Sequence, residues 1–275
     1  MTKPGISKVR VTDIGMSNVG TPTVADRLVV IPAGRSTSNH AQVARSIGID
    51  IIAGRYPEES KLPGDLELTE QFHISRPVLR ESVKTLVAKG LLTTKTRVGT
   101  VVRRRAYWNM FDADVLAWHL DAGIGERFLY DLAEIRLAVE PRAAALAAER
   151  RTDEDLALLY AAIARMEESP RHSPGETSAF ADGDLSLHLA VANAAGNPFM
   201  RSIGAVIEAA LRASFVLSAP RADQRDRSIL LHRRIVEAID AREPDAAADA
   251  MSVVVLDGLK RWDRERQSKI NEAAP

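Results

Sequence analysis

The sequence predicts a mainly α-helical protein of two domains, a small N-terminal domain that ends in a β-hairpin and a larger all-α bundle. The length of 275 residues exceeds the commonest size of one compact core. Short β-branched runs surround a turn at 91–102, and the pattern is helical nearly throughout from residue 126. We expect a flexible arm over 1–38, a first domain over 39–105, a linker and anchoring segment over 106–125, a helical domain over 126–267 and a tail over 268–275.

The composition is that of an ordinary globular protein, with 45% hydrophobic and 27% charged residues. No apolar run is long enough to span a bilayer. The chain has no cysteine, which excludes disulfides, thiolate zinc sites and cysteine nucleophiles. The first 40 residues lack the basic start and apolar run of a signal peptide. We therefore expect a cytoplasmic protein without a membrane partner.

The net charge of zero hides an asymmetry along the chain. Residues 1–105 contain 17 basic and 9 acidic residues, a net charge of +8, whereas residues 106–275 carry −8. A basic segment suits phosphate groups, so any contact with nucleic acid is expected in the first 105 residues. A basic face that only meets solvent explains the same counts, so the charge alone leaves both interpretations open.

Three short helices are predicted in the first domain, over 40–53, 65–72 and 75–86. Gly54 ends the first, and Asp65 is the expected cap of the second. The third begins with Ser75 as N-cap and has Pro77 in its first turn. Two helices joined by a tight turn and followed by a β-hairpin are typical of a winged helix-turn-helix, which places its second helix in the major groove of DNA.

The candidate DNA-binding residues follow from this arrangement. Arg76 and Arg80 are four residues apart, so they share a helical face and can reach guanine edges or phosphates. The full set is Arg45, Arg55, Ser75, Arg76, Pro77, Arg80, Lys95, Arg97, Gly99 and Thr100. An unrelated helical hairpin with solvated arginines is the alternative interpretation.

This part of the chain resembles the GntR family of bacterial transcription regulators. The resemblance is carried by residues 62–65, 74–82, 89–92 and 99–102, in the order of that family's winged domain. It implies that the third helix and the wing bind DNA. The family usually has a Glu-Arg pair where this chain has Asp65-Leu66, and a wing glycine where this chain has Arg97. Contacts with DNA at those two places therefore stay open.

A second candidate site lies in the helical part of the chain. Asp184 and His188 are spaced i, i+4, so they share one helical face where both can bind a divalent metal. His232 would supply a third ligand from another helix. Arg136 is a candidate carboxylate clamp, because a guanidinium matches a carboxylate bidentately. The alternatives are a surface ion pair between Asp184 and His188 and an intrahelical salt bridge from Arg136 to Glu140.

This part is similar to the FCD ligand-sensing domain of the FadR subfamily of those regulators. The similarity is carried by residues 134–140, 184–188, 194–198 and 231–239. It implies a divalent metal such as Zn, Ni or Mn bound by Asp184, His188 and His232, which helps to hold an organic acid. The family's fourth ligand falls at Val254, which cannot bind a metal. Three ligands completed by water and effector, weak binding, or a metal-free pocket are the alternatives.

The sequence thus predicts a homodimeric DNA-binding transcription regulator and not an enzyme. We expect a repressor that a small organic acid releases from a palindromic operator. Residues 108–118 look like the branch that includes galactonate-operon repressors, which implies a sugar acid such as an aldonate or uronate. Asn197, Asp184 and the histidines would then bind its hydroxyl groups. An architectural DNA-binding protein without an effector, and a metal-dependent hydrolase or lyase that uses the Asp184 cluster, are the competing classes.

Overall fold

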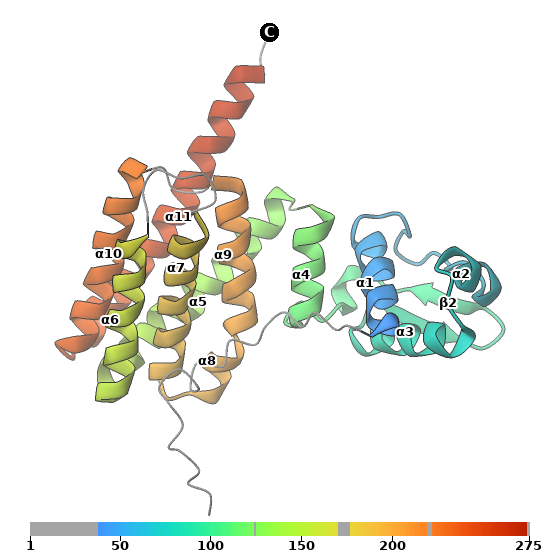
Figure 1. The fold of residues 1–275 in the computed structure, drawn as a ribbon, viewed down its shortest axis with the longest axis horizontal. Coiled ribbons are helices and arrows are strands. Elements are labelled where there is room, and N and C mark those ends of the chain that lie inside the picture. The colour runs from blue at the N-terminus through green and yellow to red at the C-terminus, as the bar shows by residue number, and fades with distance from the viewer. Residues whose placement is uncertain (1–37, 124, 170–176, 219–221, 274–275) are drawn as a thin grey trace, which may run out of the picture.

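The computed structural model describes residues 38–123, 125–169, 177–218 and 222–273. The arm expected over 1–38 therefore lies outside the described residues except for Ser38. Figure 1 shows a bundle of helices and a smaller domain, with α4 between them. Among the described residues, no helix is both long and apolar enough to cross a membrane.

The small domain is a winged helix-turn-helix, as predicted. It consists of α1 (Asn39–Ile52), α2 (Asp65–Gln71), α3 (Arg76–Ala88), β1 (Leu92–Lys95) and β2 (Gly99–Val102). The two strands pair antiparallel, with Leu92 opposite Val102 and Lys95 opposite Gly99. The chain before α2 also pairs with β2, because the amide of Leu62 donates to the carbonyl of Thr100 over 2.9 Å.

The starts of α2 and α3 differ in detail from the expectation. Gly64 takes the N-cap position of α2, so Asp65 is the first helical residue and its side chain does not cap the helix. Ser75 is the N-cap residue of α3, but its hydroxyl makes no capping hydrogen bond. Buried Ser82 instead fastens α3 to α1, since its hydroxyl donates to the carbonyl of His40 over 2.8 Å.

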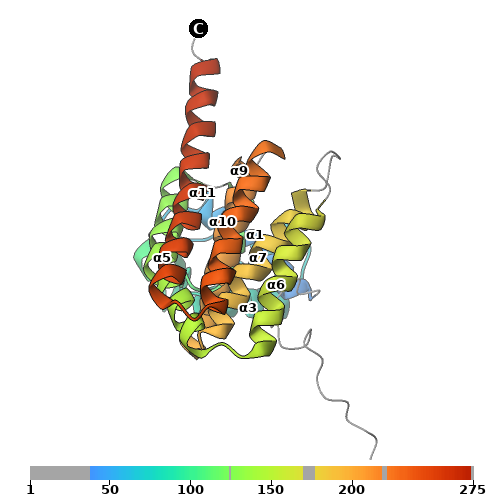
Figure 2. The same cartoon turned by 90° about the vertical axis from the view of Figure 1, so that its left-hand side faces the viewer.

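The larger domain is all-α over its described residues, as predicted. Its helices are α5 (Glu126–Arg150), α6 (Asp153–Glu168), α7 (Thr177–Ala194), α8 (Pro198–Ser202), α9 (Gly204–Ser218), α10 (Ala222–Asp240) and α11 (Pro244–Ala273). They bury a core rich in Ala, Leu, Ile and Val. In both views the end of α11 projects beyond the bundle (Figures 1 and 2). The last helix therefore runs through 268–273, where we expected a tail.

Helix α4 (Ala113–Ala122) occupies the expected anchoring segment and is buried on two sides. Val115 and Trp118 belong to the core of the winged domain. Leu116 packs instead in a cluster with Phe128 of α5 and with residues of α9. The anchoring segment therefore joins the cores of both domains. Trp118 lies directly over Gly48 of α1, which has no side chain to obstruct it.

The contact between Trp118 and Gly48 predicts a substitution effect opposite in sign to helix propensity. Gly to Ala inside a helix normally stabilises by about 1 kcal/mol. A β-carbon at position 48 would lie 2.4 Å from Cε3 of Trp118, so we expect Gly48→Ala to lower the free energy of unfolding by about 1–3 kcal/mol. Urea denaturation measures this change. Gly258→Ala is the matched control, because a β-carbon there meets no atom closer than 3.9 Å; equal stability changes in the two variants would contradict the packing argument.

Candidate functional site

A polar cavity lies in the helical domain between α5, α7, α9, α10 and α11. Its lining is mostly buried and unusually rich in charged and hydroxyl groups: Arg136, Asp184, His188, Leu211, Ser214, Ser228, Leu231, His232, Val254, Asp257, Gly258 and Arg261. In this conformation the side chains leave room for roughly one water molecule. A ligand with several heavy atoms therefore requires the cavity to expand.

Asp184, His188 and His232 come together at the centre of this cavity. Oδ1 of Asp184 lies 3.2 Å from Nε2 of His188 and 3.0 Å from Nε2 of His232. The three candidate ligand atoms lie within 4.8 Å of one another. The alternative of a surface ion pair is wrong, because Asp184 and His188 are 5% and 1% exposed.

Both imidazole rings are held from behind by hydrogen bonds at Nδ1. His188 Nδ1 contacts a carboxylate oxygen of Glu140, and His232 Nδ1 lies 2.7 Å from the carbonyl of Ser228. A carbonyl only accepts, so His232 donates from Nδ1, and its Nε2 faces Asp184. Such outer hydrogen bonds are the ones that orient metal-binding histidines. Two imidazole Nε2 atoms and a carboxylate that converge in this way suit a divalent cation.

Val254 lies where the missing fourth ligand was expected. It lines the same cavity and is 8% exposed. Its side chain offers no donor atom, so the residues present fit a cation with three protein ligands and at least one position open to water or to an acid.

The charges around the cluster shift the pKa values of its members. Burial acts to lower the pKa of His188, but Glu140 and Asp184 outweigh it and raise the pKa to about 9. Burial acts to raise the pKa of Asp184, yet His232 and His188 hold it well below its usual range. Burial likewise acts to raise the pKa of Glu140, and Arg136 and His188 lower it to about 2. The cluster is therefore built from two buried carboxylates that demand positive charge.

Arg136 and Glu140 form the intrahelical salt bridge that we considered as an alternative. Arg136 Nε contacts one carboxylate oxygen, and Nη2 lies 3.4 Å from the other. The two residues are only 8% and 2% exposed. Arg136 nevertheless lines the cavity, so its position is compatible with either role.

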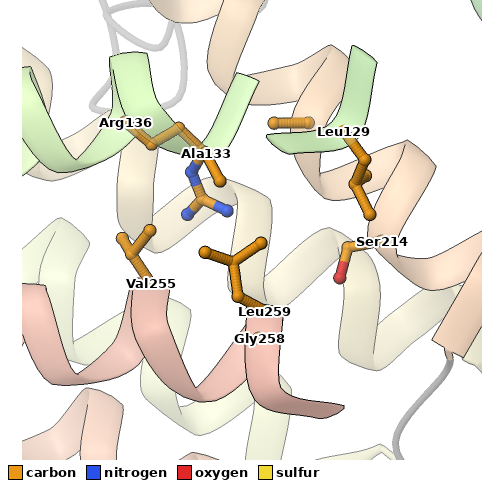
Figure 3. A pocket seen from close by; sticks show the side chains of 8 residues that line it. Leu129, Ala133, Arg136, Ser214, Val255, Gly258 and Leu259 are labelled. Carbon is orange, nitrogen blue, oxygen red and sulfur yellow. The ribbon is translucent and has the colours of Figure 1, made fainter. Parts of the chain in front are cut away.

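A second, more apolar pocket adjoins the first. The two share Arg136, Ser214 and Gly258. The other residues that line the second pocket are apolar: Leu129, Ala133, Ala210, Val255 and Leu259. Figure 3 shows the guanidinium of Arg136 pointing away from α5 toward α11, where Val255 and Leu259 lie. The whole space thus has a polar and an apolar end.

Asn197 is not among the residues that line this cavity, contrary to our expectation. Its side-chain oxygen accepts a hydrogen bond from the amide of Phe199 over 3.0 Å and so caps α8. The sequence analysis in turn missed four residues around the cavity: Glu140 as the partner of His188, Ser228, Asp257 and Arg261. The spacing of Asp257 and Arg261 from Val254, at i+3 and i+7, was the available signal.

The expected DNA-binding residues divide into two groups. Arg76, Pro77 and Arg80 on α3 are exposed. Arg45 instead pairs with Asp121 of α4 over 2.8 Å, and Arg55 pairs with Asp50. Ion pairs therefore occupy the two arginines on and after α1, while the start of α3 presents its basic side chains to solvent.

The wing is basic and contains one unusual backbone conformation. Lys95, Arg97 and Gly99 are exposed, and Thr100 is half-buried. Arg97 has a φ of +65°, in the left-handed region that glycine adopts most easily. The sequence analysis missed Lys61, whose side chain lies beside Gly99 and adds a further positive charge to the wing.

Comparison with known proteins agrees with both halves of this description. A profile described as "Bacterial regulatory proteins, gntR family" matches residues 39–102, and the FCD domain profile matches residues 131–256. The galactonate operon transcriptional repressor of Escherichia coli (strain K12) is 31% identical over 222 residues, which cover 80% of this chain and 95% of the relative. The uncharacterised HTH-type regulator YieP of the same strain is 30% identical and covers 78% of this chain and 90% of its own.

A solved structure is similar in fold. It is that of Lar, which controls the expression of the Listeria monocytogenes agr system. The sequence identity is 19%, the TM-score is 0.58, and the match covers 84% of this chain and 99% of the other. This likeness supports the two-domain fold.

The buried pair on α5 predicts a large effect of removing one charge. Glu140→Gln leaves Arg136 buried without its counter-charge, so we expect the free energy of unfolding to fall by about 3–5 kcal/mol. Asp131→Asn is the matched control, because Asp131 pairs with Arg127 at the same i, i+4 spacing on the same helix but both side chains are exposed. Its effect should stay below about 1 kcal/mol in urea denaturation. Similar losses in both variants would contradict the burial argument.

Proposed function

The chain belongs to the gntR family of bacterial regulatory proteins, in the FadR-like subfamily with an FCD domain, and we propose that it is a homodimeric repressor released from DNA by a small organic acid. The observation that carries the proposal is the buried polar cavity around Asp184, His188 and His232, in one chain with an exposed basic helix α3. The matches are to transcription regulators, so we assign this cluster a sensing role rather than a catalytic one.

The winged domain binds an operator in the cytoplasm through α3 and the wing. The first turn of α3 enters the major groove, where Arg76 and Arg80 contact guanine edges or phosphates. Ser75 and the free amides at the start of α3 bind a phosphate. Lys95 and Arg97 follow the adjacent backbone or minor groove. Two subunits related by a twofold axis bind the two halves of a palindrome.

The FCD domain binds the acid in the polar cavity. The relative named as the galactonate operon repressor suggests a sugar acid, an aldonate or a uronate. Asp184, His188 and His232 would hold a divalent Zn, Ni or Mn ion, which supplies positive charge for the carboxylate. Ser214 and Ser228 line the same space and suit hydroxyl groups of the ligand.

Expansion of the cavity is the step that links the acid to DNA. Because the cavity has room for roughly one water molecule, a bound acid pushes its walls apart. Ala210 of α9 lines the apolar pocket and also packs in the cluster that contains Leu116 of α4. Movement there shifts α4 and with it the winged domain. An acid that weakens operator binding is itself bound less tightly by the DNA-bound protein.

Removal of the basic side chains of α3 tests the DNA-binding half. A specific site is first selected from random duplex DNA with the native protein. Arg76→Ala and Arg80→Ala should each weaken binding to that site by about 5- to 100-fold, as measured by fluorescence anisotropy. Lys84→Ala on the same helix is the control, because Lys84 pairs with Glu81 and lies two turns beyond Arg76. Unchanged site affinity in both arginine variants would rule out α3 as the recognition helix.

Thermal unfolding with a panel of acids tests the sensing half. EDTA-treated protein is mixed with aldonates, uronates and small dicarboxylates, with and without zinc, nickel or manganese. We expect at least one acid to raise the melting temperature, and to do so more strongly with metal, because the ion completes the positive charge beside Asp184. Loss of the metal effect in His232→Ala would support the cluster as its site. The absence of any response would refute the sensing role.

A further inference from the structure

One face of α11 forms a wall of the cavity that the sequence analysis did not recognise as a binding surface. Val254, Asp257, Gly258 and Arg261 all line the cavity and follow the spacing of a single helical face. Arg261 is only 9% exposed, although its side chain is long and charged. A guanidinium this deeply placed requires anionic or polar partners.

The side chain of Arg261 lies back along its helix toward the metal-binding cluster. Gly258 makes this course possible, since a β-carbon at that position would stand 3.9 Å from Nη2 of Arg261. Helical side chains lean toward the N-terminus in this way, over the residue three or four positions earlier. The guanidinium therefore lies on the cavity wall opposite α7, close enough for the charge of Asp184 to act on it.

The charges around Arg261 leave more room for an additional anion than those around Arg136. Asp257 is shared, because one of its oxygens accepts from Arg227 over 3.1 Å and the other lies 3.6 Å from Nη1 of Arg261. Together these three side chains carry one positive charge. Arg136, by contrast, has both oxygens of Glu140.

We propose that Arg261 binds the carboxylate of the effector, and that Arg136 is a positioning residue that keeps Glu140 against His188. The inference rests on the proposed function and names the anchor of its ligand. The ligand class is a short hydroxy acid whose carboxylate forms a bidentate pair with Arg261. Its hydroxyl groups then lie within the part of the cavity lined by Ser214 and Ser228.

Matched Arg-to-Lys substitutions separate the two arginines. Lysine keeps the positive charge but loses the planar fork that grips a carboxylate at two points. We expect Arg261→Lys to weaken acid binding by about 10-fold and Arg261→Gln by about 100-fold, from the strength of charge-assisted hydrogen bonds. Arg136→Lys still faces Glu140 with a charge and should change acid affinity by less than about 3-fold.

The measurement is isothermal titration of the full chain with D-galactonate and with D-glucuronate. D-Galactose is the uncharged control, and the native protein should not bind it measurably. Two further readouts guard against a merely structural effect of the Arg261 variants. Zinc affinity without acid, and affinity for the selected DNA site without acid, should both match those of the native protein.

The outcomes distinguish the inference from the function on which it rests. Acid binding that survives in Arg261→Gln, or that fails instead in Arg136→Lys, would overturn the assignment of Arg261 while the regulator stands. Equal loss of zinc affinity in the Arg261 variants would also overturn it. Native protein that binds neither acid would refute the carboxylate site itself, and native protein without specific DNA binding would refute the proposed function.

Discussion

Burial of α4 on two sides is the physical constraint that fixes how the two domains are joined. Trp118 fills the space over Gly48 in the winged domain, while Leu116, two residues earlier, packs against the helical domain. Lys89 strengthens the first contact, because its half-buried amine lies 2.7 Å from both Asp112 and Asp114. Burial acts to lower the pKa of Lys89, but the two carboxylates outweigh it and raise the pKa. The winged domain is therefore not tethered by a free linker, and a shift of α4 must move it.

The second constraint is the balance of charge inside the bundle. Asp184 and Glu140 are buried carboxylates, and buried charges persist only when they are paired. Arg136 and the histidines supply part of the pairing, and a metal ion would supply more. This arrangement explains why the cavity remains polar inside a helical core that is otherwise rich in Ala, Leu, Ile and Val. The apolar pocket beside it reaches Ala210, which packs against α4's neighbours, so the sensing space and the joint between the domains share a wall.

Much of this fold could be predicted because its signals are local. The Ser75-Arg76-Pro77 start of α3 and the β-branched runs of the wing identify a winged helix-turn-helix within a few residues. The i, i+4 spacing of Asp184 and His188 places both on one face of α7 whatever the tertiary structure. Asn197 was assigned wrongly although its signal was also local, since an Asn before a Pro commonly caps the next helix.

The rest depended on which helices are neighbours, and periodicity within one helix does not contain that information. The contact between Glu140 and His188 joins positions 48 residues apart on α5 and α7. Arg261 lines the cavity only because α11 packs along α5 and α10. Arg45 was expected to contact DNA, but it pairs with Asp121 because α4 lies against α1.

The central claim is that acid in the helical domain and DNA on the winged domain are coupled through α4. The most direct measurement is the dissociation constant for the selected DNA site with and without a saturating acid. The account predicts weaker DNA binding with acid by about 5- to 150-fold, and weaker acid binding with DNA by the same factor. Equal DNA affinity in both conditions, with acid demonstrably bound, would contradict it.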